Sequence, residues 1–87
     1  HNLEDKLADI KAPTLLIWGI QDSVTPVWVG EEFHELIPNS ELVKVDRCGH
    51  APMMERPDLF NIALESFINR VEDGTFIENR KAVTVLD

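Results

Sequence analysis

Along this chain, segments with an unbroken run of hydrophobic residues are followed by segments in which hydrophobic residues recur at helical spacing. Residues 14–18 form an unbroken apolar and β-prone run that ends at Gly19, which predicts a strand covered on both faces. Thr25 and Pro26 then read as the N-cap and first residue of a helix, whose apolar positions recur until Pro38 stops it.

The same alternation repeats further along the chain. Residues 40–45 predict a second strand, and residues 46–49 form a turn-prone stretch. Pro57 opens a second helix whose apolar stripe consists of Phe60, Ala63, Leu64, Phe67, Ile68 and Val71. This order predicts an α/β fold with parallel strands joined by right-handed crossovers. Residues 1–12 add a short amphipathic helix or turn that Pro13 closes.

Residues 71–87 do not continue that plan. Asp73 and Gly74 predict the end of the helix, and two β-prone stretches, 75–77 and 82–86, follow on either side of a polar segment. The pattern fits a hairpin, a linker or a disordered tail. We therefore divide the chain into a core portion, residues 1–70, and a tail, residues 71–87.

Charge and cysteine content narrow the range of partners. Sixteen Asp and Glu against eight Lys and Arg give a net charge of −8, which disfavours nucleic acid and anionic membranes as partners. Cys48 is the only cysteine, so the chain has no internal disulfide, and a reducing, cytoplasmic location is expected. Because the chain starts at His1 and not at Met, we also expect that a segment precedes it.

Two residues with catalytic potential follow the two predicted strands. Asp22 lies just beyond the first strand, and His50 lies just beyond the second. Loops at the carboxyl ends of adjacent parallel strands meet at one edge of a sheet, so these side chains are expected to form a hydrogen bond. An aspartate paired with one ring nitrogen of a histidine fixes its tautomer and leaves the other nitrogen free to act as a base.

The loops around these two residues resemble a known family. The stretch A-P-T-L-L-I-W-G-I-Q-D-S-V-T-P, followed by C-G-H-A-P-M-M-E-R-P-D-L-F-N, is similar to the last two strand-and-helix units of the α/β-hydrolase fold. Within that superfamily it looks most like the meta-cleavage-product carbon–carbon hydrolases and related small esterases. The resemblance implies that Asp22 is the triad acid, that His50 is the triad base, and that no cofactor or metal is needed. Gly49 matches the small residue that lets the histidine loop turn tightly.

The nucleophile of that family has no counterpart in this chain. Ser23, Ser40 and Ser66 are the only serines, and none stands in a G-x-S-x-G elbow. One interpretation is that the chain is the C-terminal portion of a serine-type hydrolase that cleaves an ester or carbon–carbon bond. The alternative is a non-catalytic structural or interaction fragment of the hydrolase fold. In both cases we expect self-association, or pairing with a missing N-terminal portion, and no hydrolysis by the isolated chain.

Other candidate residues have structural as well as functional interpretations. Trp28, Met53 and Met54 flank the two loops, and they either line a pocket for an apolar or aromatic substrate or belong to the core. The lone Cys48 is expected to pack beneath the histidine loop and not to act as a nucleophile. A solvated position is expected for His34, and a metal site built from Asp22, His34 and His50 matches no known ligand spacing.

Overall fold

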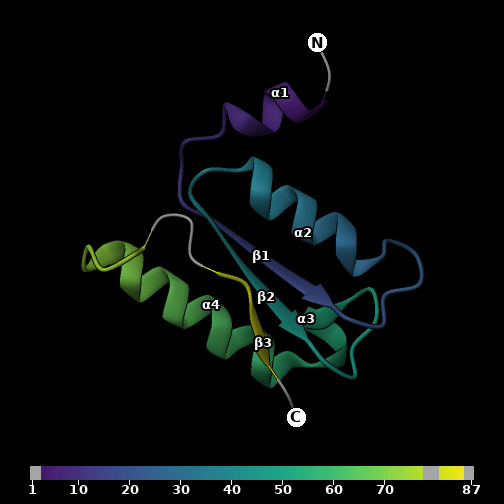
Figure 1. Ribbon diagram of the computed structural model, residues 1–87. Coiled ribbons are helices and arrows are strands. Elements are labelled where there is room, and N and C mark those ends of the chain that lie inside the picture. The colour runs from purple at the N-terminus through teal and green to yellow at the C-terminus, as the bar shows by residue number, and fades with distance from the viewer. Residues whose placement is uncertain (1–2, 78–80, 86–87) are drawn as a thin grey trace.

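A three-stranded parallel sheet forms the centre of the computed structural model, which describes residues 3–77 and 81–85. The strands follow one another across the sheet in chain order: β1 (Thr14–Gly19), β2 (Ser40–Val45) and β3 (Val83–Val85). The described helices are α1 (Leu3–Ala8), α2 (Val27–Leu36), α3 (Pro52–Glu55) and α4 (Pro57–Glu72). Figure 1 shows the sheet between α2 and α4. The α/β fold predicted from the hydrophobic spacing is therefore confirmed.

The core is centred on β2, the middle strand. Leu42, Val43 and Val45 are almost fully buried, because neighbouring strands cover both edges of β2 and helices cover its faces. The side chains packed against this core come from both neighbouring strands and from α4: Leu15, Ile17, Leu59, Ala63 and Val85. This burial on both faces explains why apolar residues stand side by side in β2, at Leu42 and Val43, and do not strictly alternate.

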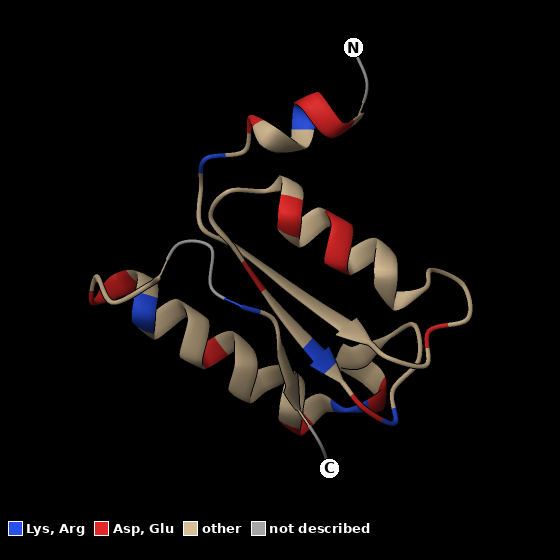
Figure 2. Ribbon diagram, in the orientation of Figure 1, with Lys and Arg blue, Asp and Glu red and all other residues tan. Residues whose placement is uncertain are grey.

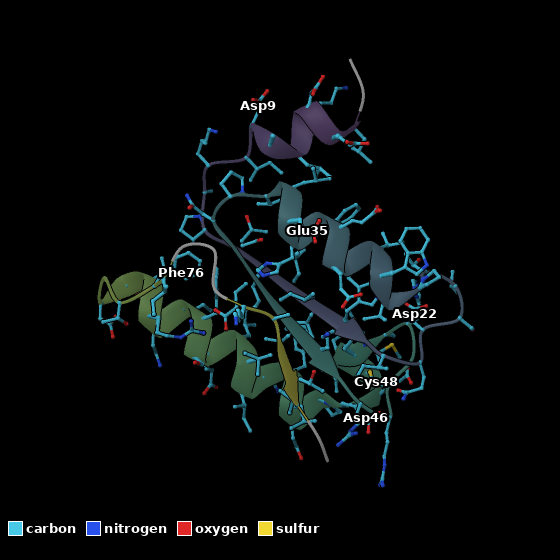
Figure 3. All side chains as sticks on the ribbon, viewed as in Figure 1. Asp9, Asp22, Glu35, Asp46, Cys48 and Phe76 are labelled. Carbon is cyan, nitrogen blue, oxygen red and sulfur yellow. The ribbon has the colours of Figure 1, made fainter. Side chains whose placement is uncertain are left out.

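A buried ion pair fastens the C-terminal half of α4 to the sheet. Glu41 of β2 is only 3% exposed, and its carboxylate accepts hydrogen bonds from both terminal nitrogens of Arg70, at 2.6 and 2.9 Å. The bidentate geometry compensates for the removal of both charges from water. After α4 the chain turns back at Gly74, which has a positive φ of 79°, and Phe76 packs edge-on against Phe67 with ring centroids 5.6 Å apart (Figure 3).

The tail does not form the hairpin that its β-prone stretches suggested. Residues 75–77 are not a strand, and β3 instead pairs in parallel with β2, with Val83 beside Val43 and Val85 beside Val45. The long helix α4 carries the chain back along the sheet, so the next strand runs in the same direction as β2. Residues 78–80 and 86–87 lie outside the described part of the chain, and a domain boundary at residue 70 stays a prediction.

The surface of the described chain carries its negative charge on several elements. Figure 2 shows acidic positions on α1, α2 and α4, with fewer basic positions between them. Among residues 3–77 and 81–85, no helix combines the length and the apolar character that crossing a membrane would require.

The close approach of the two strand ends provides a test of the packing. A methyl group at Gly19 would collide with the backbone carbonyl groups of Cys48 and Gly49, which cannot move without shifting the histidine loop. We expect Gly19→Ala to lower the free energy of unfolding by about 1–3 kcal/mol, measured by denaturant titration. The control is Gly74→Asn, since Gly74 has open space around it and asparagine tolerates a positive φ. Equal stability of the Gly19 variant and the native chain would contradict the tight approach.

The outer edge of β1 provides a second test. Within the described residues β1 pairs only with β2, so its other edge presents unpaired backbone groups to a further strand. We expect concentration-dependent self-association, detected by analytical ultracentrifugation, with a melting temperature that falls on dilution. A monomer whose melting temperature is independent of concentration would show that this edge does not recruit a second chain.

Candidate active site

The parallel pairing of β1 with β2 brings two loops together at the carboxyl edge of the sheet. The last residue of β1, Gly19, lies beside Val45, the last residue of β2, and the amide of Ile20 still donates to the carbonyl of Val45 at 2.9 Å. Gln21 then bonds to the second loop through both backbone and side chain: its amide donates to the Cys48 carbonyl and its Oε1 accepts from the Cys48 amide, each at 3.0 Å. Figure 3 shows Asp22, Asp46 and Cys48 together at this edge.

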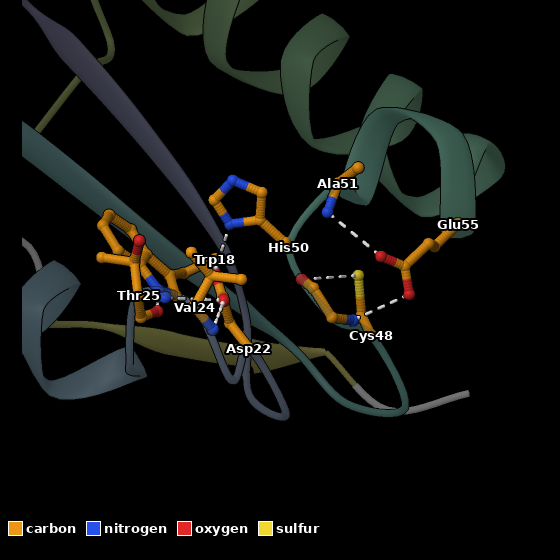
Figure 4. Close-up of polar contacts among 9 residues, drawn as sticks. Trp18, Asp22, Val24, Thr25, Cys48, His50, Ala51 and Glu55 are labelled. Atoms are coloured by element: carbon orange, nitrogen blue, oxygen red, sulfur yellow. Dashed lines mark hydrogen bonds and ion pairs between the residues drawn. The ribbon is translucent and has the colours of Figure 1, made fainter.

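Asp22 and His50 form a hydrogen bond across the two loops, as the sequence predicted. The distance from Asp22 Oδ2 to His50 Nδ1 is 3.0 Å (Figure 4). The other carboxylate oxygen, Oδ1, accepts hydrogen bonds from the backbone amides of Val24 at 2.9 Å and Thr25 at 2.8 Å. The carboxylate is thus held by its own loop while it orients the imidazole ring.

The environment of Asp22 keeps its carboxyl group ionised. The side chain is 5% exposed, and this burial raises its pKa. The hydrogen bonds from Thr25, His50 and Val24 together lower the pKa by more than burial raises it, so the pKa of Asp22 lies below the ordinary 3.8. At neutral pH this group is therefore a carboxylate that accepts a hydrogen bond from His50 Nδ1–H.

His50 differs from Asp22 in being accessible. Its side chain is 62% exposed, and Figure 4 shows the second ring nitrogen on the side of the ring away from Asp22. The pair lies at a hollow of about 200 Å³, whose other lining residues are Ile17, Trp18, Gly19, Thr25 and Pro52. A buried acid and an exposed base beside a largely apolar hollow can abstract a proton from a group that enters from solvent.

Trp18 forms a fixed wall of this hollow. Its indole nitrogen donates to the Thr25 carbonyl at 2.9 Å, and its ring meets Phe33 edge-on at 6.1 Å. Gly30 of α2 lies directly on the Trp18 ring, since a Cβ there would come within 2.7 Å of it. Trp18 ends the apolar run that predicted a covered strand, and the structure places it at the hollow.

The three residues predicted to line a substrate pocket lie elsewhere. Trp28, Met53 and Met54 are 56%, 53% and 80% exposed, and none of them lines the hollow beside His50. The structure brings them neither into the core nor into this hollow, and their role in substrate binding stays a prediction.

Cys48 packs beneath the histidine loop, as expected. It is 2% exposed, and burial together with the negative charge of Glu55 raises the pKa of its thiol. The thiol is therefore protonated at neutral pH and is a poor nucleophile.

His34 corrects the expectation of a solvated histidine. It is half-buried, and its Nδ1 lies 2.9 Å from Ser40 Oγ at the start of β2. In the part of the chain that the structure describes, no three His, Cys, Asp or Glu side chains, His34 included, lie close enough together to hold a metal ion.

Glu55 was not singled out from the sequence, yet it contacts the histidine loop directly. The Glu55 carboxylate accepts hydrogen bonds from the backbone amides of Gly49 at 2.9 Å and Ala51 at 3.1 Å, on the two sides of His50. These two bonds lower the pKa of Glu55 below its ordinary 4.5, and the bond from Ala51 has the larger effect. The available signal was an acidic residue one turn after the start of a short helix, a spacing related to the capping box.

Comparison with known sequences places this fold and this pair of loops in a family. The family described as "alpha/beta hydrolase fold" matches residues 1–57. A 2-hydroxy-6-oxononadienedioate/2-hydroxy-6-oxononatrienedioate hydrolase of Burkholderia vietnamiensis is 38% identical over 65 residues, which cover 75% of this chain and 23% of that enzyme. The monoacylglycerol lipase ABHD6 of Mus musculus is 39% identical over 57 residues, which cover 66% of this chain and 17% of the lipase.

A solved structure agrees with these relatives. The crystal structure of an alpha/beta hydrolase enzyme from the metagenome of lagoon sediments at Mar Chica, Morocco, superposes with a TM-score of 0.78 and 43% identity, covering 83% of this chain and 33% of that one. The present chain spans less than a quarter of the length of these two relatives, 23% and 17% respectively. On the family match and the shared three-dimensional arrangement, the chain belongs to the α/β hydrolase fold family.

Proposed function

We propose that this chain supplies the acid and the base of a serine-type hydrolase that cleaves an ester or carbon–carbon bond. The observation that carries the proposal is the Asp22–His50 hydrogen bond of 3.0 Å between the ends of two parallel strands. In this assignment Asp22 holds the Nδ1–H tautomer of His50, and the other ring nitrogen takes the proton of an attacking hydroxyl group. The same nitrogen then returns the proton to the leaving group.

The nucleophile and the groups that stabilise the oxyanion come from outside this chain. The sequence holds no G-x-S-x-G elbow, and the buried, protonated Cys48 is no substitute. The catalytic unit is therefore this chain together with the portion that carries the nucleophile, and the open edge of β1 is the place at which that portion pairs.

The substrate class rests on the hollow and on the relatives. The hollow is lined largely by apolar side chains and the Trp18 ring, which suits an apolar or aromatic acyl group. Of the relatives named above, one is a hydrolase of an oxo-dienedioate and one is a monoacylglycerol lipase, so carbon–carbon and ester bonds are the two reactions to assay. A cytoplasmic location belongs to the same proposal, since it fits a chain with one free, buried cysteine.

The isolated 87-residue chain should not hydrolyse esters. An acid–base pair without a nucleophile and an oxyanion hole cannot form or stabilise an acyl intermediate. The measurement is initial velocity against a panel of nitrophenyl esters and vinylogous diketones. Saturable activity that disappears in a Cys48→Ala variant would show that the thiol is the nucleophile and would overturn the assignment.

A hybrid enzyme tests the proposed roles of Asp22 and His50 directly. In the metagenomic hydrolase, the segment that matches this chain would be replaced by this chain, at the equivalent strand boundaries. We expect the hybrid to hydrolyse esters, and we expect kcat/KM to fall by about 10⁴-fold in both His50→Ala and Asp22→Asn.

The matched control in the hybrid is His34→Ala, which removes a histidine outside the site. It should change kcat/KM by less than about tenfold if the hybrid stays folded by circular dichroism. A folded hybrid that keeps its activity after His50→Ala would refute the assignment of the base.

A further inference from the structure

The loop that carries His50 does not hold its shape through regular secondary structure. It runs from Asp46 to Ala51 between β2 and the four-residue helix α3. Arg47, its second residue, has a positive φ of 55°, which lies in a backbone region that residues other than glycine rarely adopt. A loop with a residue in this region persists only where its surroundings fix it.

Side chains from outside the loop accept hydrogen bonds from several of its backbone amides. Gln21 Oε1 accepts from Cys48, and the two oxygens of Glu55 accept from Gly49 and from Ala51. Glu55 thus bonds to the residue before His50 and to the residue after it, one oxygen to each. Figure 4 shows the bond between Glu55 and Ala51. Two bonds to one carboxylate fix the path of the backbone through His50, and with it the direction in which the ring leaves the loop.

The space around Gly49 supports a close fit between the loop and the carboxylate. A Cβ added at Gly49 would lie 3.2 Å from both Glu55 oxygens, which is tighter than an ordinary contact. The small residue before His50 therefore leaves room for the carboxylate as well as for the turn. Glu55 also lies close enough to His50 for an electrostatic interaction, which contributes to the lowered pKa of Glu55 after its two backbone hydrogen bonds.

We propose that Glu55 is a positioning residue of the active site. It holds His50 in place for catalysis by accepting hydrogen bonds from the backbone amides of Gly49 and Ala51. This inference rests on the proposed function of His50 as the base. In this arrangement Asp22 orients the ring at Nδ1, and Glu55 orients the backbone from which the ring extends.

The first test follows the loop without requiring catalysis, by NMR on the 87-residue chain and its Glu55→Gln variant. Glutamine keeps the shape of the side chain but offers a single acceptor oxygen, so one of the two amides loses its partner. We expect amide exchange at Gly49 or Ala51 to accelerate about tenfold or more, and the Nδ1-bound proton of His50 to lose its hydrogen-bonded chemical shift. Glu65→Gln, on the exposed surface of α4, removes the same charge elsewhere and should change neither signal.

The pH dependence separates positioning from general stabilisation. Folding lowers the pKa of Glu55 below its unfolded value of 4.5. The two hydrogen bonds therefore contribute fully to the stability of the folded chain above pH 4.5, and this contribution is lost as the pH falls through the lower pKa of the folded chain. In the native chain the amide signals of Gly49 and Ala51 should therefore shift together below pH 4.5, and in Glu55→Gln this shared titration should be absent. If the His50 ring signals are unchanged in the variant, the inference is wrong, whatever happens to the amides.

The hybrid enzyme distinguishes a failure of this inference from a failure of the proposed function. In an active hybrid, Glu55→Gln should lower kcat by about ten- to a hundredfold with little change in KM, because His50 is displaced while the hollow is intact. Combined with His50→Ala it should have almost no further effect, since both changes act on one group. An additive double variant would overturn the positioning role, whereas a folded hybrid that turns over equally with and without His50 would overturn the proposed function.

Discussion

The in-register parallel pairing of β1 with β2 is the constraint on which the site depends. Gly19 and Val45 end the two strands side by side, so the loops that follow leave the sheet at the same edge and in contact. A slip of one residue in this register would turn every side chain of one strand to the opposite face and would separate Asp22 from His50. The missing side chain at Gly19 then lets the backbones approach closely enough for Gln21 to bond to Cys48. The chemistry of the site is thus a consequence of sheet geometry.

Two buried carboxylates show how the chain accommodates negative charge inside a small core. Glu41 is neutralised by the two terminal nitrogens of Arg70, and this pair joins α4 to β2. Asp22 is held instead by two backbone amides and one ring nitrogen. Because backbone amides carry no net charge, Asp22 keeps its negative charge available to the imidazole, whereas the charge of Glu41 is consumed by its partner. The difference in partners explains why one buried acid serves structure and the other suits a site.

Local pattern was sufficient to predict the elements but not all of the contacts. The strands at residues 14–19 and 40–45 and the long helix from Pro57 follow from runs of apolar residues, and the Asp22–His50 pair follows from the rule that parallel strands end at one edge. Helix α3 was not predicted because four residues carry no periodic signal. The β-prone stretch at residues 82–86 contains β3, but its parallel pairing with β2 was not predicted because the two strands are far apart in the sequence. The contacts of His34 and Glu55 were not predicted although their partners lie only four to six residues away, because these contacts cross the end of a helix, where the periodic pattern stops.

The contrast in exposure between acid and base follows from the same architecture. Asp22 lies within its loop and is covered, while His50 stands on the second loop with most of its ring accessible. The acid is held entirely by groups of this chain, so the pair needs no substrate or further segment in order to form. In the proposed reaction a hydroxyl group would lie beside the second ring nitrogen of His50, and a substrate would meet the pair at the apolar hollow between Trp18 and Pro52. Under the proposed function, this pre-formed geometry reduces the remaining requirement for catalysis to the placement of one nucleophile and its oxyanion donors.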